Sequence, residues 1–342
     1  MTKRPSQAKA SWLSRVAALR AVVLPVAFVI AAHAVGARAA SPGSLEGVVQ
    51  ITAYVPQEAR TARTLGTERQ GTGVVIDDSG LILTIGYLVL EAAEIEIEGA
   101  GPEPVPASIV AYDHESGFGL VRTQHPLELA PIPLGVSAEV QTREPLLVVS
   151  RTGELDAAGV YVVDRRDFAG YWEYLLEDAI FTAPPHAQFG GAALIDRVGR
   201  LVGIGSLLVN DAGFSGRPIP GNMFVPIDHL KPIMGDLLTR GRRADPGRPW
   251  LGVSVEEHKG RVFVTRVSPD GPAASAGIAP NDVILGIDGV QVHGLMDFYR
   301  KLWDRGEAGV EVPLNVLQGM EIQPVLVKSS DRYRYLRLNP TY

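Results

Sequence analysis

The chain has 342 residues, of which 46% are hydrophobic and 20% are charged, so it has enough apolar material for two cored domains. It contains no cysteine, which excludes disulfides, a thiolate nucleophile and cysteine-ligated metal sites. The formal net charge is −6, and a net acidic chain is poorly suited to bind nucleic acid or an anionic membrane.

The first 40 residues have the pattern of an export signal. Residues 1–20 carry five basic side chains and no acidic one, residues 21–36 form the apolar run AVVLPVAFVIAAHAVG, and small residues follow at Ala37 and Ala39. This order is typical of a secretory signal peptide. We therefore expect residues 1–40 to be a signal peptide, and the mature protein to be periplasmic or otherwise extracytoplasmic. The alternative is a membrane anchor, for which 16 residues that include Pro25 and His33 are short.

Residues 45–227 are rich in short segments with high β propensity, separated by Gly, Pro, Asp and Asn. Ten such segments occur, from GTGVVID at 71–77 to NMFVPID at 222–228. So many strands with little helix between them predict a sandwich or barrels. A helix is expected over 227–242, with Asp228 as its N-cap and Gly241 at its end.

The pattern changes after ADPGRP, which has the composition of a linker at 244–249. Strand-like segments then alternate with a short helix in PAASAG and a second helix near 295–304. About 90 residues of this kind are enough for a compact α+β module. We therefore predict one domain over 41–243 and a second over 250–342.

Several stretches, in the same order along the chain, resemble the HtrA/Deg family of trypsin-like serine proteases. They are GTGVVIDDSGLILT, DAIFTAPPHAQFGGAALIDRVGRLVGI, NMFVPIDHLKPIMGDLLTRGR and RPWLGVSV, and VTRVSPDGPAASAGIAPNDVILGIDGVQV resembles the PDZ domain of the same family. The resemblance covers about 45–330. It implies a mainly β protein: a trypsin-like double six-stranded β-barrel followed by an α+β PDZ domain.

The positions that carry catalysis in this family hold other residue types here. Tyr87 stands at the family's histidine, after the strand that ends in ILT. The family's aspartate lies in a D-x-x-x-D-L-A segment, which DHESGFG matches with Gly117 at the second acid, and Phe189 stands at the serine. Tyrosine has a pKa of about 10 and is a poor base at neutral pH, and the other two side chains carry no reactive atom. We predict that no member of the triad is intact.

The loop that forms the oxyanion hole in this family is degenerate as well. Ala187 stands where the family has a glycine two residues before the serine. Gly190 and Gly191, which follow that position, are kept. This pattern indicates that part of the loop geometry survives without the nucleophile.

A rearranged catalytic site is the alternative, because triads are defined by geometry and not by order along the chain. His186, His114 and Ser116 lie close in sequence to the substituted positions. We expect them to be solvated loop residues. The histidines outside the signal show no HxH or HExxH spacing, so we predict neither a metal nor a cofactor.

A PDZ groove binds an extended peptide as an added strand and holds its carboxylate with backbone N–H groups. The resemblance places the carboxylate-binding loop at Trp250, Leu251, Gly252 and Val253. The helix near 295–304 would form the other wall, with apolar candidates at Leu295, Phe298, Tyr299 and Leu302. We expect Leu302 to lie in the core, and Trp250 has the alternative role of a wedge between the two domains.

Together these features predict an exported HtrA-like pseudoprotease. Its expected partners are peptides or the C-termini of unfolded exported proteins, and the resemblance implies assembly as a homotrimer or with active homologues. An active serine endopeptidase with a rearranged site and an envelope scaffold with a vestigial groove are the alternatives.

Overall fold

A computed structural model describes residues 45–99, 101–213 and 218–336 of the chain. The predicted signal peptide, residues 1–40, lies outside these residues. Within the described part, every helix is too short or too polar to cross a membrane.

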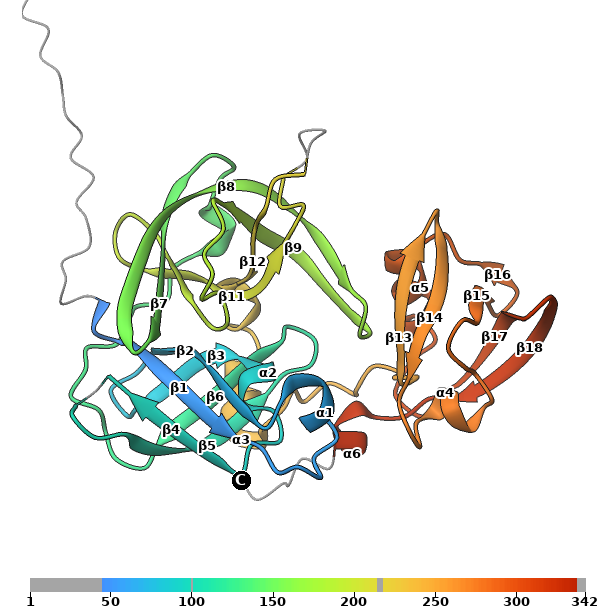
Figure 1. Cartoon of the computed structure of the whole chain (residues 1–342), viewed down its shortest axis with the longest axis horizontal. Helices are drawn as coiled ribbons and strands as arrows, with labels where there is room; N and C mark the ends of the chain where they lie inside the picture. The colour runs from blue at the N-terminus through green and yellow to red at the C-terminus, as the bar shows by residue number, and fades with distance from the viewer. Residues whose placement is uncertain (1–44, 100, 214–217, 337–342) are drawn as a thin grey trace, which may run out of the picture. The chain divides into compact units, whose positions relative to one another are not determined.

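Residues 48–123 form the first β-barrel (Figure 1), which closes in the antiparallel order β1-β2-β3-β6-β5-β4. Its strands are β1 (Val48–Tyr54), β2 (Glu68–Val75), β3 (Leu81–Ile85), β4 (Glu94–Glu98), β5 (Val105–Tyr112) and β6 (Phe118–Thr123), with the short helices α1 (Ala62–Leu65) and α2 (Gly86–Val89) between them. Successive side chains of β4 point to opposite faces of the sheet: Ile95 and Ile97 are buried, whereas Glu94 is exposed.

The second β-barrel closes in the order β10-β11-β12-β9-β8-β7. Its strands are β7 (Pro145–Thr152), β8 (Glu154–Gly170), β9 (Tyr174–Ala183), β10 (Ala193–Ile195), β11 (Leu201–Val209) and β12 (Gly221–Pro226). Gly170 pairs with Tyr174, so residues 171–173 form the tip of the long β8–β9 hairpin. Two closed six-stranded barrels confirm the predicted double-barrel fold.

The C-terminal domain is built on a sheet of the order β13-β14-β15-β17-β18, with β16 paired to β15. Its elements are β13 (Val253–His258), β14 (Arg261–Val267), α4 (Pro272–Ser275), β15 (Val283–Ile287), β16 (Val290–Gln291), α5 (Leu295–Trp303), β17 (Glu311–Gln318) and β18 (Glu321–Lys328). Residues at spacings of three and four along α5, namely Leu295, Phe298, Tyr299 and Leu302, are all buried. Leu302 lies in the core, as predicted.

The helix predicted over 227–242 is shorter than expected. It is split into a 3₁₀ turn, η3 (Ile227–His229), and α3 (Met234–Arg240). Pro232 has no N–H and cannot donate to the carbonyl of Asp228, so the helix does not continue through this point. Asp228 is not its N-cap and instead accepts the backbone N–H of Ala138 at 2.9 Å. Gly241 ends α3 in the left-handed conformation, as predicted.

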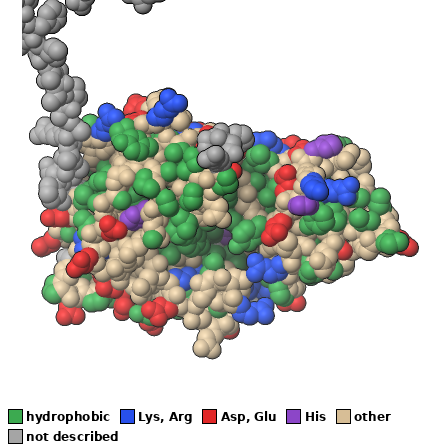
Figure 2. Space-filling model, turned by 45° about the horizontal axis from the view of Figure 1, so that its top comes forward, with side chains coloured by type: hydrophobic (Ala, Val, Ile, Leu, Met, Phe, Trp, Pro, Cys, Tyr) green, Lys and Arg blue, Asp and Glu red, His purple; other side chains and the backbone are tan. Residues whose placement is uncertain are grey.

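Charged side chains of both signs are interspersed with apolar ones on the face shown in Figure 2.

The apolar side chains inside the molecule form separate clusters. One combines residues of both barrels, such as Ile51 and Phe181, and another belongs to the C-terminal domain. After β18, the short helix α6 (Arg332–Leu336) returns the chain to the first barrel, where the Tyr333 hydroxyl donates to the Tyr112 carbonyl at 2.7 Å.

Candidate functional site

Tyr87 lies on α2, beside the loop that carries Phe189. Its hydroxyl donates a hydrogen bond to the Ser206 carbonyl at 3.0 Å, and a Cβ atom on Gly190 would come within 3.1 Å of that hydroxyl. Burial raises the pKa of Tyr87 well above its ordinary value, so the phenol keeps its proton at neutral pH. A protonated hydroxyl that already donates to a carbonyl cannot act as a general base.

Gly117 lies in the turn between β5 and β6, next to the segment that carries Tyr87. Its carbonyl accepts the N–H of Gly86 at 2.7 Å, and its φ of +85° is in the region that favours glycine. A Cβ atom at this position would lie 3.4 Å from the hydroxyl of Tyr174, which donates to the Ser116 carbonyl at 2.7 Å. A neutral phenol therefore borders the place where the family's carboxylate would begin.

The loop around Phe189 is held by contacts with the first barrel. The N–H of Thr72 donates to the Gly190 carbonyl at 2.9 Å, and the N–H of Gly191 donates to the Gly205 carbonyl at 2.9 Å. A Cβ atom on Gly191 would come within 1.9 Å of the Thr72 carbonyl oxygen, so only glycine fits there. Phe189 itself is half-buried. The fold thus brings Tyr87, Gly117 and the loop of Phe189 close together, and the side chains at these three positions are a phenol, none and a phenyl ring.

Ala187, the fourth position of the degenerate loop, is exposed. His186, directly before it, was expected to be solvated, and this expectation is wrong: its exposed fraction is 6%. Its backbone N–H donates to the Asn222 side chain at 2.7 Å, which holds the residue against the second barrel. Burial lowers the pKa of His186, and nearby Asp156 opposes that effect.

A serine–histidine contact that the sequence does not reveal lies beside this loop. The Ser150 hydroxyl is 2.8 Å from His186 Nε2 and 3.1 Å from the Gln188 side-chain oxygen. Asp156 approaches the same Nε2 at 3.9 Å, whereas in a triad the carboxylate binds the other ring nitrogen. Ser150 is fully buried in β7, so its hydroxyl is closed to a substrate. No motif surrounds Ser150, and sequence reasoning had no signal to find it.

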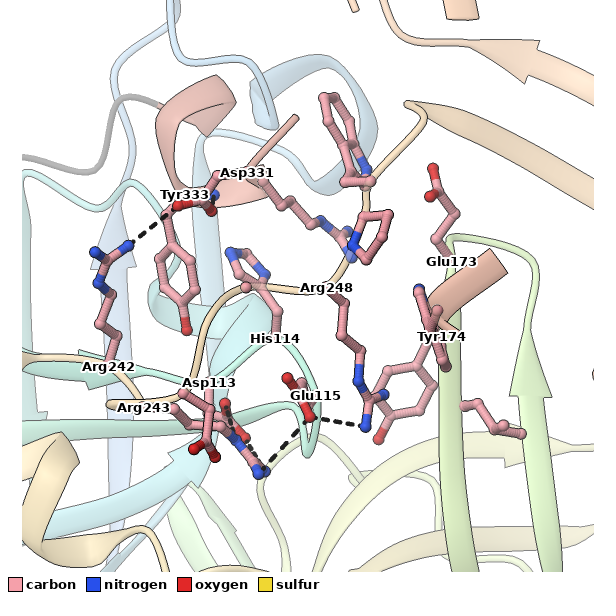
Figure 3. Close-up of a pocket in the computed structure, with 17 residues that line it drawn as sticks. Asp113, His114, Glu115, Glu173, Tyr174, Arg242, Arg243, Arg248, Asp331 and Tyr333 are labelled. Carbon is pink, nitrogen blue, oxygen red and sulfur yellow. Dashed lines mark hydrogen bonds and ion pairs between the residues drawn. The ribbon is translucent and has the colours of Figure 1, made fainter. Parts of the chain in front are cut away.

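The turn that contains His114 and Ser116 was also expected to be solvated, and it is not (Figure 3). Ser116 has an exposed fraction of 2%, and the His114 ring lies between those of Tyr112 and Tyr333, with centroids 4.4 and 4.2 Å away. Burial lowers the pKa of His114 well below its ordinary value, so the ring is neutral. Tyr333 of α6 covers this turn, and no pattern in the sequence predicts that α6 packs here.

Asp113, at the start of this turn, forms a two-point ion pair with Arg243 of the segment after α3. Arg243 Nε and Nη2 donate to the two carboxylate oxygens at 2.8 and 2.9 Å. Burial alone would raise the pKa of Asp113, but Arg243 and the donors of Ser116 outweigh it and lower that pKa. Asp113, His114 and Arg243 line one small cavity of about 60 Å³, shown in Figure 3.

The predicted carboxylate-binding loop precedes β13 and is shaped by Gly252, whose φ is +82°. The backbone N–H groups of Leu251, Gly252 and Val253 point at one carboxylate, that of Glu173, at distances of 2.9, 2.7 and 2.9 Å. Burial raises the pKa of Glu173, and these three donors oppose that effect. The loop therefore has the geometry to hold a carboxylate.

Trp250 begins this loop, and both its backbone and its ring contact the C-terminal segment of the chain. It exchanges backbone hydrogen bonds with Ser330, each at 3.0 Å, and its ring packs on Tyr335 of α6 at 4.5 Å between centroids. The Tyr335 ring also contacts the first barrel, because the Arg60 guanidinium lies over it, 4.0 Å from the ring centroid. This arrangement supports the alternative role of Trp250 as a wedge between the domains.

Two family models match the chain: a trypsin-like peptidase domain over 71–204 and a PDZ domain over 249–328. Together with the two closed barrels, these matches show a trypsin-like protease fold followed by a PDZ domain.

Two known proteases and one solved structure are similar to the chain over most of its length. The chain is 28% identical to protease Do-like 1, chloroplastic, from Arabidopsis thaliana, covering 80% of this chain and 66% of that protein. It is 26% identical to a probable periplasmic serine endoprotease DegP-like from Pseudomonas fulva, covering 69% and 51%. The crystal structure of the serine endoprotease from Yersinia pestis shares the fold, with a TM-score of 0.51 at 21% identity over 84% of this chain and 96% of that one. The chain is thus similar to these proteases in its fold, and it spans between half and two thirds of the length of the two curated relatives.

Proposed function

We propose that this chain is an exported HtrA-type pseudoprotease that binds peptides or the C-termini of unfolded proteins and does not hydrolyse them. The observation that carries the proposal is the chemistry of the converging positions: a protonated phenol at Tyr87, no side chain at Gly117 and a phenyl ring at Phe189. Removing a whole serine-protease triad lowers kcat by roughly 10⁶-fold. Here the scaffold is kept while all three roles are vacant.

Binding is supported by the loop at residues 250–253, whose three converging N–H groups match the chemistry that recognises a peptide carboxylate. A solved HtrA-type protease, AlgW, which shares the fold with a TM-score of 0.51, was determined with a decapeptide. The Pseudomonas fulva relative is named periplasmic, which supports export. We further propose domains over 41–243 and 250–342, joined by 244–249, and assembly as a homotrimer or with active homologues.

The second candidate function is serine endopeptidase activity from a rearranged site. The contact between Ser150 and His186, at 2.8 Å, favours it, and the relatives are named as proteases. Against it stand the full burial of Ser150 and the approach of Asp156 to the nitrogen that already faces the serine.

A cleavage assay separates the two functions. The purified chain without residues 1–40 is incubated with an unfolded model protein and followed on a gel, beside Ser150→Ala and the triple variant Tyr87→His, Gly117→Asp, Phe189→Ser. We expect no cleavage by the natural chain, because Tyr87, Gly117 and Phe189 supply no base, carboxylate or nucleophile and Ser150 is fully buried. Cleavage by the triple variant alone would assign the loss to these three positions.

The contrary result is cleavage by the natural chain that persists after repurification. If Ser150→Ala then abolished it, the protein would be an endopeptidase with a rearranged site, and the pseudoprotease proposal would be wrong.

A further inference from the structure

The tip of the β8–β9 hairpin is hydrogen-bonded to the PDZ loop that is expected to bind a peptide. Glu173, at this tip, is 6% exposed, and its two carboxylate oxygens accept all three N–H groups of Leu251, Gly252 and Val253. These are the donors that a peptide C-terminus would use. The carboxylate-binding loop is therefore already occupied by a side chain of the same molecule.

The backbone of the hairpin tip also pairs with the edge of the PDZ sheet. The N–H of Val255 on β13 donates to the carbonyl of Tyr171 at 2.8 Å. Tyr171 precedes Glu173 by two residues, so the pair presents a backbone carbonyl to β13 and a carboxylate to the loop. A peptide added to this edge as a strand would make the same two kinds of contact.

Helix α5 holds the hairpin tip from the other side of the groove. The Tyr299 hydroxyl donates to the Gly170 carbonyl at 2.7 Å and accepts the Glu173 N–H at 3.1 Å. Leu175, just past the tip, is part of the apolar cluster of the PDZ domain. The tip thus supplies the carboxylate and the strand contact, and Leu175 directly after it supplies an aliphatic side chain.

Glu173 adopts this position in an unfavourable backbone conformation. Its φ is +54°, a region that residues other than glycine, Asn and Asp seldom enter. Such conformations persist when the surrounding contacts determine them. Here those contacts are the three N–H groups of the loop and the Tyr299 hydroxyl.

We propose that the hairpin tip, Gly170–Tyr174, is an internal ligand of the PDZ groove, in which Glu173 takes the place of a peptide's C-terminal carboxylate. An external peptide binds only when the tip leaves. The ligand that fits the vacated groove has a free C-terminal carboxylate and an aliphatic last residue, because Glu173 and Leu175 supply these two groups in the closed form. This inference rests on the proposed peptide-binding function and adds how that function is controlled.

Competition sets the size of the expected effect. An apparent affinity falls in proportion to the fraction of molecules whose site is open, so a tip docked in about 90% of molecules weakens peptide binding about tenfold. A variant that cannot dock the tip should therefore bind the peptide about tenfold more tightly than the natural protein.

The test uses the full chain without residues 1–40 and a fluorescein-labelled decapeptide that ends in Tyr-Trp-Leu with a free carboxylate. Binding is measured by fluorescence anisotropy for the natural protein, Glu173→Ala and Tyr299→Phe. The matched control is Glu177→Gln, which removes an exposed charge from the same hairpin. The amidated decapeptide controls for the carboxylate. Hydrogen exchange of the amides at 251–255 is followed without peptide, as a readout of docking that does not depend on the probe.

We expect Glu173→Ala and Tyr299→Phe to bind the free-carboxylate peptide at least about tenfold more tightly than the natural protein and Glu177→Gln. The amides of 251–253 should exchange faster in Glu173→Ala because their acceptor is gone, and the Val255 amide should exchange faster because the Tyr171 carbonyl leaves with the tip. Equal affinity in all forms with unchanged exchange would overturn the internal ligand and leave the peptide-binding function intact. Faster exchange in Glu173→Ala with no binding by any form would overturn the peptide-binding function itself, and with it the competition.

Discussion

At the scale of single residues, two glycines at and near the Phe189 loop are required by packing. A Cβ atom on Gly191 would come within 1.9 Å of the Thr72 carbonyl oxygen, and one on Gly205 within 2.1 Å of the Phe189 carbonyl oxygen. These contacts join the loop to the first barrel and to β11. Packing alone therefore requires glycine at positions 191 and 205.

The ion pair between Asp113 and Arg243 should contribute to stability in a pH-dependent way. Removing one partner of a buried pair costs about 3–5 kcal/mol, so we expect Asp113→Asn to lower the free energy of unfolding at pH 7 by about 3 kcal/mol. The folded-state pKa of Asp113 is lowered, so its contribution is present above its ordinary pKa of 3.8 and is lost as the pH falls toward the folded value.

Urea unfolding of both proteins at pH 7 and pH 3 measures this effect, with Asp78→Asn as a control for an exposed carboxylate. The difference between the natural protein and Asp113→Asn should shrink at pH 3. A difference of the same size at both values would show that ionisation of Asp113 does not stabilise the fold.

At the scale of elements, two segments decide how the site is arranged. The β8–β9 hairpin carries Glu173 into the PDZ loop and, one residue later, carries the Tyr174 hydroxyl to the turn at Gly117. Helix α6 covers the same turn through Tyr333 and packs under Trp250 through Tyr335. Both segments lie far from their contacts in sequence.

The packing of Trp250 on Tyr335 should be measurable as a coupling energy. Aromatic pairs contribute about 0.5–1.5 kcal/mol beyond their buried area, so unfolding of Trp250→Ala, Tyr335→Ala and the double variant should give a coupling of about 1 kcal/mol. Trp250→Ala combined with Tyr161→Ala, whose ring is 57% exposed, is the control and should be additive. Additive effects for Trp250 and Tyr335 would exclude the wedge role.

At the scale of the whole molecule, local patterns predicted the architecture well. The short β-rich segments predicted a sandwich or barrels, and the resemblance to the HtrA/Deg family selected the double barrel. The apolar residues near 295–304 predicted a helix there, and the structure buries Leu295, Phe298, Tyr299 and Leu302. The docking of Glu173 could not, because it depends on a contact across 78 residues and the surrounding stretch, YWEY, has no motif. The burial of His114 and His186 was missed because segments distant in sequence cover them. The helix predicted over 227–242 is too long because its apolar residues continue past Pro232, where the backbone lacks the N–H that a continuous helix needs.

The central claim is that the chain binds peptides without cleaving them, and native mass spectrometry tests both parts in one spectrum. The Glu173→Ala chain without residues 1–40 is incubated overnight with the unlabelled free-carboxylate decapeptide. We predict a complex with one intact peptide per protomer and no shorter peptide in solution. Free protein together with peptide fragments would contradict the claim.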